Sequence, residues 1–153
     1  EGAWGGSGGP GVYGTLDIPT SGMVAQRTRL NVIASNLANK STILDADGNV
    51  NPYRRRIVNF SPGDPSAGSA AGRGMGVHVS SIEKDDAPFN LRYDPSSPYA
   101  YEDGPKKGYV PTPNVSSVVE QVNAIEATRA YEANVAAAEA IKSMSSQAMR
   151  LLA

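Results

Sequence analysis

The sequence predicts a mainly α-helical fold with a small β appendage, in which an N-terminal and a C-terminal helix pair as an antiparallel coiled coil. The first observation is the placement of helix breakers: apart from Gly22, no Gly or Pro falls within residues 20–40 or 114–153. The second is that apolar side chains recur at helical spacing in both stretches. The intervening residues 41–112 are dense in Gly and Pro and contain short alternating segments, which indicates strands and turns.

The opening residues 1–14 are dominated by glycine around a lone Trp4. We interpret this segment as a flexible Gly-rich tail or an addition to the native chain. The alternative is an arm that docks Trp4 on a neighbour.

An apolar seam marks the first helix, expected at about 20–39 with room for one more turn before Pro19. Thr20 and Ser21 are both candidate caps for its start. The N-terminal seam repeats every seven residues with one intermediate position, and it comprises Leu16, Met23, Leu30, Ile33 and Leu37.

A longer seam follows Pro113, where Asn114 or Ser116 can cap a helix of about forty residues, roughly 60 Å long. The spacing alternates between three and four residues, as in a coiled coil. Such a helix is too long for a 20-residue partner to cover, so its remaining apolar surface points to another chain. The C-terminal seam comprises Ala127, Ala130, Asn134, Ala137, Ile141, Met144, Ala148 and Leu151.

Connectivity predicts the direction of the two helices. The chain leaves the first helix near residue 40 and returns near 113, so these points must lie close together and the helices run antiparallel. We expect the earlier part of the first helix near Ile141 and the later part nearer Ala130, with Leu30 facing Ala137.

The three predicted parts are the tail 1–14, a discontinuous helical domain of 15–40 plus 113–153, and a β-rich insertion of 41–112. Within the insertion, we expect strands at 53–60, 76–82 and 89–93. The small and polar residues 61–75 predict a mobile loop.

Composition excludes several classes of function. The net charge of −1 argues against a general nucleic-acid binder, and the absence of Cys excludes disulfides and thiolate metal sites. One His cannot supply a two-His zinc site. We find no apolar run long enough to span a membrane and no cleavable signal peptide.

Three motifs fall short of a binding site. The loop after Asp45 has Arg56 where a calcium loop needs glutamate, so it is interpreted as a polar turn. The glycines of 72–76 lack the Lys-Ser/Thr pair of a phosphate loop. The arginines 54–56 alternate between the faces of a strand, which favours salt bridges within or between subunits over a nucleic-acid site.

No catalytic constellation emerges from the remaining polar residues. Glu83, Asp85 and Asp86 crowd one turn beside Lys84, which indicates a solvated turn rather than a pair of catalytic carboxylates. His78 lies between two valines with no acid or nucleophile placed by spacing. We therefore expect no catalytic residue, cofactor or metal.

Four segments of the sequence resemble a known family. SGMVAQRTRLNVIASNLANKST and TRAYEANVAAAEAIKSM are similar to the terminal signatures of bacterial flagellar axial proteins, the rod, hook and hook-associated proteins. NPYRRRIVNF and APFNLRYDPSSPYAYEDGPKKGYVPTPNV resemble the proximal rod proteins within that family. The resemblance covers about 14–153, with Lys40-Ser41 and the insert ILDADGNVN departing from it.

The resemblance implies a structural subunit rather than an enzyme. It implies terminal helices in an inner coiled coil, helical stacking with copies of itself and other rod proteins, and a place in the periplasmic part of the basal body. It also implies export without cleavage by the flagellar type III apparatus. Another rod protein, a rod-associated peptidoglycan hydrolase and a coiled-coil adaptor are the alternatives; muramidase activity would favour the hydrolase.

Overall fold

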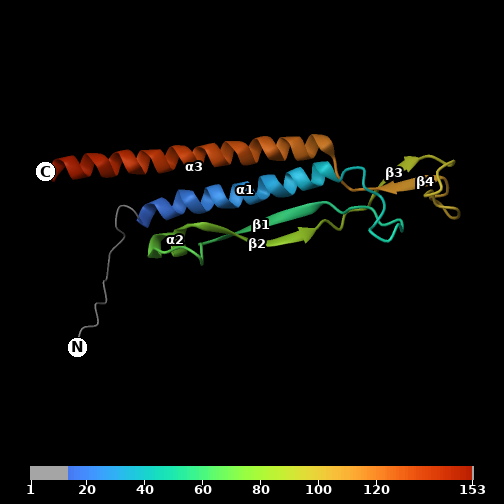
Figure 1. The fold of residues 1–153 in the computed structure, drawn as a ribbon, viewed down its shortest axis with the longest axis horizontal. Helices are drawn as coiled ribbons and strands as arrows, with labels where there is room; N and C mark the ends of the chain where they lie inside the picture. Colours follow the sequence, from blue (N-terminus) through green and yellow to red (C-terminus); the bar gives the residue numbers. More distant parts are fainter. Residues whose placement is uncertain (1–13, 153) are drawn as a thin grey trace, which may run out of the picture. The chain divides into compact units, whose positions relative to one another are not determined.

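The computed structural model describes residues 14–152, which form four helical segments and four strands (Figure 1). Gly14, at the edge of the Gly-rich opening, begins a short 3-10 helix. The interpretation of residues 1–13 as a tail falls outside the described residues. The elements are η1 (Gly14–Leu16), α1 (Asp17–Ala38), β1 (Arg56–Pro62), α2 (Ala70–Met75), β2 (Val77–Lys84), β3 (Asn90–Tyr93), β4 (Tyr109–Thr112) and α3 (Ser117–Leu151).

The contacts divide the chain into two compact units. Unit 1 combines the residues up to Thr28 with Phe60–Ser80 and Ala127–Ala153, and unit 2 combines Arg29–Asn59 with Ser81–Glu126. Each unit therefore takes one part of α1, one part of α3 and a piece of the chain between them.

Helix α1 begins at Asp17, ahead of Pro19, because η1 runs directly into it. Pro19 is tolerated there, since N–H groups of the first turn have no partner within the helix. The prediction that Thr20 or Ser21 caps α1 is wrong. Ser21 lies inside the helix, where its hydroxyl donates to the Ile18 carbonyl at 2.7 Å and accepts from the Val77 amide at 3.0 Å.

Helix α3 runs for 35 residues, or about 52 Å. Of the two predicted caps, Ser116 acts at its start: its hydroxyl accepts from the Val119 amide at 3.4 Å. Asn114 instead bonds to residues of the insertion. The prediction of a long unbroken second helix is confirmed.

Two small two-stranded sheets make up the β structure, one of β1 and β2 and one of β3 and β4. In the second sheet, Leu91 lies opposite Pro111 and Tyr93 opposite Tyr109, antiparallel. The strands predicted at 53–60, 76–82 and 89–93 are present with shifted ends. Strand β4 was not predicted, because Pro111 interrupts it; a proline is tolerated at the edge of a sheet.

The prediction of an unstructured loop over 61–75 is wrong in part, because residues 70–75 form α2. The Ser69 hydroxyl caps α2 by accepting from the Gly72 amide at 3.1 Å. The same hydroxyl donates to the Gly14 carbonyl at 3.0 Å, and the Ser69 amide donates to the Asp17 carboxylate at 3.2 Å. Contacts with η1 and α1, which composition does not reveal, thus order this segment.

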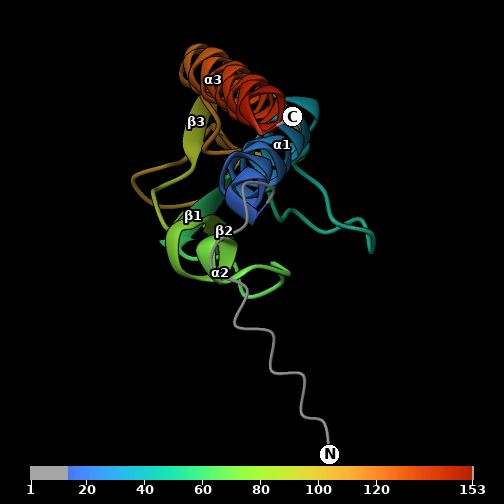
Figure 2. The same ribbon diagram turned by 90° about the vertical axis from the view of Figure 1, so that its left-hand side faces the viewer.

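Within unit 1, the first part of α1 lies between the last part of α3 and α2 (Figures 1 and 2). Among the described residues, neither long helix combines the length and apolar character that crossing a membrane requires.

Candidate assembly site

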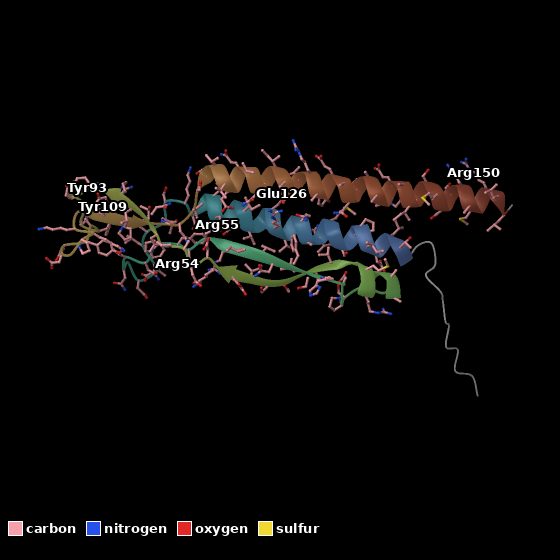
Figure 3. The ribbon with its side chains drawn as sticks, turned by 180° about the vertical axis from the view of Figure 1, so that it is seen from behind. Arg54, Arg55, Tyr93, Tyr109, Glu126 and Arg150 are labelled. Carbon is pink, nitrogen blue, oxygen red and sulfur yellow. The ribbon has the colours of Figure 1, made fainter. Side chains whose placement is uncertain are left out.

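A buried carboxylate joins three segments in unit 2. Glu120, in the first turn of α3, has a fully buried side chain. One of its oxygens accepts from Nε of Arg55, and the other accepts from the Asn36 amide at 3.3 Å. Arg55, which is labelled in Figure 3, also contacts Asp85 at 3.3 Å. The carboxylates of Glu120 and Asp85 both contact the guanidinium of Arg55. We call these three side chains the polar junction.

The charge of Arg55 is secured by its partners. Burial by itself disfavours the guanidinium, but the hydrogen bond and negative charge of Glu120, followed by those of Asp85, leave the pKa of Arg55 above its ordinary value. The positive charge that Glu120 needs is therefore present throughout the physiological pH range.

Asn36 connects the end of α1 to the segment that enters β1. Its side-chain oxygen accepts from the Arg56 amide at 2.9 Å and from the Tyr53 hydroxyl at 2.8 Å. Its amide group donates to the Arg56 carbonyl at 3.0 Å as well as to Glu120. Every hydrogen-bonding group of this buried side chain is used, as a buried amide requires.

Asn114 connects the chain just before α3 to both ends of the insertion. Its oxygen accepts from the Arg55 amide at 2.8 Å, and its amide group donates to the carbonyls of Asp85 and Ala87 at 3.0 and 3.1 Å. Arg54 donates to the same two carbonyls and stacks on the Phe89 ring at 4.2 Å. The polar junction therefore lies where the insertion leaves and rejoins the helices.

Unit 1 brings the same helices together through small residues. A Cβ added to Gly22 would lie 2.6 Å from the Asn134 amide group, so α1 and α3 approach closely here because Gly22 has no side chain. On another side of α1, a Cβ on Gly72 would lie 2.7 Å from Cβ of Asp17. In unit 1, the elements therefore pack through close approach at glycines, whereas unit 2 uses a buried ion pair.

These contacts confirm the antiparallel direction and correct the register. Gly22 faces Asn134, Arg29 pairs with Glu126 at 3.5 Å, and Asn36 contacts Glu120. Leu30 follows Arg29 and lies level with residues 126–127. Ala137 is about ten residues, or roughly 15 Å, farther along α3. The expected pairing of Leu30 with Ala137 is wrong because α3 begins its contacts with α1 in its first turn.

The predicted N-terminal seam is buried or half-buried along its whole length. This holds for Leu16, Met23, Leu30, Ile33 and Leu37, of which Ile33 is the most deeply buried.

The predicted C-terminal seam divides between two faces of α3. Ala127 is buried, and Ala130, Asn134 and Ile141 are half-buried, whereas Met144 is 67% and Leu151 87% exposed. Ala137 and Ala148 are also exposed. The face that is buried or half-buried instead follows a shifted row, which we call the buried row: Glu120, Ala124, Ala127, Tyr131, Asn134, Ala138, Ile141 and Ser145.

The exposed members of the predicted C-terminal seam belong to a second line of residues along α3. Successive members are three or four residues apart, so they share one side of the helix. We call this line the exposed stripe, and it comprises Ala133, Ala137, Ala140, Met144, Ala148 and Leu151, all exposed. Nearer the start of α3, the apolar side chains of Val118, Val122 and Ile125 are also more than half exposed.

The other polar candidates have structural partners. His78 shares a 2.7 Å hydrogen bond between Nδ1 and the Gly63 carbonyl. The Asp45 carboxylate accepts from the amides of Asp47 and Asn49, which confirms a polar turn. The predicted salt bridge of the arginine run is confirmed within the chain at Arg55. Among residues 14–152, no group of three acidic or His side chains is placed to hold a metal ion.

Sequence reasoning missed Glu120 and Asn36. The available signal was an acid in the first turn of an otherwise apolar helix face, where the helix dipole also favours a negative charge.

Comparisons with known proteins show what this sequence is similar to. A family model described as "Flagella basal body rod protein" matches residues 16–42, and one described as "Flagellar basal body rod FlgEFG protein C-terminal" matches residues 106–151. These ranges contain all of α1 and all of α3.

Relatives extend the similarity over most of the chain. The flagellar basal-body rod protein FlgC of Borreliella burgdorferi is 42% identical over 93% of this chain and 98% of its own length. FlgC of Bacillus subtilis is 38% identical over 91% and 97%, and FlgC of Salmonella typhimurium is 43% identical over 84% and 89%. With identities of 38–43% over most of its length, this chain belongs to the FlgC family of flagellar basal-body rod proteins.

Proposed function

We propose that this protein is a structural subunit of the flagellar basal-body rod, and that it assembles with copies of itself and with other rod proteins through its terminal helices. The observation that carries the proposal is the exposed stripe of α3. Monomeric proteins rarely leave a continuous apolar surface uncovered unless another molecule covers it.

The shape of the exposed stripe suits helix packing. Alanines at Ala133, Ala137 and Ala140 allow a neighbouring helix to approach closely, while Met144 and Leu151 supply larger apolar groups. A stripe that packs on a different surface of the next subunit makes a heterologous contact. Such contacts repeat into helical assemblies when they do not close into a ring.

The buried row supports the finer proposal that α1 and α3 form the two-helix coiled coil of an inner domain. Its members alternate by four and three residues, the spacing of coiled-coil contacts. In this proposal, residues 15–40 and 113–153 make the inner domain and residues 41–112 the β-rich outer part.

Export by the flagellar type III apparatus and a periplasmic position in the rod complete the proposal. Both rest on membership of the FlgC family. The relatives are named as basal-body rod proteins, and we assign the chain no catalytic step.

Motility complementation tests the role of the exposed stripe. A strain lacking its own FlgC protein would receive Ala137→Glu, with Gln121→Glu as the matched control. Both changes add one acid to an exposed position of α3, but Gln121 lies off the stripe. We expect the control to swim and Ala137→Glu to be exported but not incorporated into rods, because the new charge would be buried in the contact.

Normal swimming and normal rods with Ala137→Glu would overturn assembly through this stripe. Thermal unfolding of both purified variants shows whether the chain still folds.

A further inference from the structure

The buried row of α3 continues past the point where α1 covers it. Ile141 is half-buried and Ser145 is buried. Leu152 follows Ser145 by seven residues, which is about two helical turns, so it stands on the same side of the helix. Leu152 is nevertheless 88% exposed. Every residue from Ser146 to Leu152 is exposed, and we call residues 146–152 the projecting end.

The projecting end leads away from the α1 of its own chain. The two helices run antiparallel with Gly22 against Asn134, so Asp17 lies level with about residue 139. Ser146 is about seven residues, or roughly 10 Å, farther along α3. Figure 1 shows the last turns of α3 extending past the start of α1. The contact between α1 and α3 therefore stops before the projecting end begins.

A groove of unit 1 has an apolar wall that is partly uncovered. The groove lies between α1 and β2, and its volume is about 390 Å³, within the roughly 300–1,000 Å³ typical of small-molecule sites. It can therefore take side chains but not a whole helix. Val24 of α1 and Val77 and Val79 of β2 supply apolar lining. Val24 is 49% exposed, so an apolar occupant would remove its surface from water.

The groove and the projecting end carry opposite charges. Among the described residues that line the groove, Asp17 and Asp64 are acids and none is Lys or Arg. Residues 140–152 contain Lys142 and Arg150 and no acid. Figure 3 shows Arg150 on the last turns of α3. Opposite charges on two surfaces attract each other and fix the orientation in which they meet.

We propose that the projecting end docks in this groove of a second copy of the chain, with Leu152 against Val24. Arg150 then lies beside Asp17 and Asp64. The inference rests on the proposed function as a self-assembling subunit, and it identifies one surface that receives the neighbour. The groove of the same chain is out of reach, because it lies alongside α1 and the projecting end leads away from α1.

The contact is head-to-tail and separate from the exposed stripe. Leu152 continues the buried row, whereas the stripe ends at Leu151, about 100° away around the helix. Each joined pair keeps one open groove and one open end, so further copies can add. Seven residues are fewer than the roughly 20–30 a side of a standard interface. Two copies alone should therefore associate weakly, and a test must trap the contact.

Disulfide trapping tests the contact, because the sequence has no Cys. Val24→Cys and Leu152→Cys proteins, each the full chain, are purified separately, mixed and treated with an oxidant. We expect a mixed disulfide dimer, identified by mass spectrometry, in severalfold higher yield than from Val119→Cys mixed with Leu152→Cys. Val119 is 48% exposed and lies outside the groove. Equal yields from the two mixtures would overturn the proposal.

A charge variant tests the orientation of the docked end. Arg150→Glu, introduced into the Leu152→Cys chain, should lower the yield severalfold, because the new acid would face Asp17 and Asp64. Arg129→Glu is also an exposed change on α3 but lies outside the projecting end, and it should leave the yield unchanged. An equal effect of the two changes would overturn the proposal.

A chain that carries both cysteines tests the head-to-tail arrangement. It should give trimers and longer products as well as dimers, because every joined pair keeps a groove and an end available. A product that stops at the dimer would contradict this arrangement. Circular dichroism verifies that each variant is folded.

The outcomes separate this inference from the proposed function. If the mixed dimer is no more abundant than the control while Ala137→Glu still prevents incorporation into rods, the groove contact is wrong and assembly through the exposed stripe stands. If the mixed dimer forms but Ala137→Glu swims normally, the exposed stripe is not the assembly surface and the groove contact stands.

Discussion

The two units hold α1 and α3 together by different means. Unit 2 uses a buried charge, with Glu120 bonded to Arg55 and Asn36. Unit 1 uses close approach, with Gly22 against Asn134. The same pair of helices can therefore be held together by polar side chains in one region and, in another, by a glycine whose missing side chain allows close approach.

The two kinds of contact are sensitive to different substitutions. A buried ion pair tolerates poorly the loss of one partner, because the other keeps its desolvation cost without compensation. A close contact tolerates poorly the addition of atoms, because packed interiors have no room for them. Substitutions that remove a charged side chain should therefore destabilise unit 2 most. Substitutions that add side-chain atoms should destabilise unit 1 most.

The largest effect is expected for Glu120→Ala. Removing the carboxylate leaves Arg55 and Asn36 without their shared acceptor. We expect a loss of about 3 kcal/mol in the free energy of unfolding, measured by urea denaturation. The control is Glu126→Ala, which removes an exposed carboxylate paired with Arg29 and should cost less than about 1 kcal/mol. Equal losses in the two variants would contradict a special role for the polar junction.

The next effect is expected for Gly22→Ala. Alanine favours a helix over glycine by about 1 kcal/mol, yet the added methyl would meet the Asn134 amide group at 2.6 Å. We expect a net loss of about 1–2 kcal/mol in urea denaturation. Gly74→Ala, with open space around the new Cβ, should show the helix preference alone and gain stability.

A double-mutant cycle identifies the cause at Gly22. In an Asn134→Ala background, the same Gly22→Ala change should stabilise the protein, because the obstructing amide is gone. Destabilisation of equal size in both backgrounds would assign the cost to something other than this contact.

A smaller and more local effect is expected for Asn114→Ala. The change removes the acceptor of the Arg55 amide and the donor to the carbonyls of Asp85 and Ala87. We expect a loss of about 1–2 kcal/mol and faster amide hydrogen exchange at Arg55. Asn114→Asp keeps the acceptor and should preserve protection at Arg55; faster exchange there in both variants would contradict the assigned bonds.

The sequence predicted what depends on periodicity and connectivity. Both long helices, their antiparallel direction and the burial of Leu30, Ile33 and Leu37 follow from apolar spacing and from where the insertion leaves and returns. The family was predicted from longer sequence motifs such as NPYRRRIVNF. These features are repeated along many residues, so a single exception does not obscure them.

The missed features depend on contacts between distant residues. Helix α2 exists because Ser69 bonds to Gly14 and Asp17, and the role of Glu120 depends on Arg55, 65 positions away. The C-terminal seam was displaced for a related reason. Alanine dominates this part of α3, so rows one residue apart are almost equally apolar, and only the contact partner decides which row is buried.

The smallest effect is expected for a substitution at Ala137, which tests which of those two rows of α3 is the packed one. Ala137 belongs to the exposed stripe and Ala138 to the buried row. Ala137→Glu should change the free energy of unfolding by less than about 0.5 kcal/mol, whereas Ala138→Glu places a carboxylate in the half-buried face and should cost about 1 kcal/mol or more. Urea denaturation of the purified protein measures both changes, which introduce the same residue at adjacent positions. If Ala137→Glu were the more damaging change, the seam first predicted from the sequence, rather than the buried row, would be the packed face of α3.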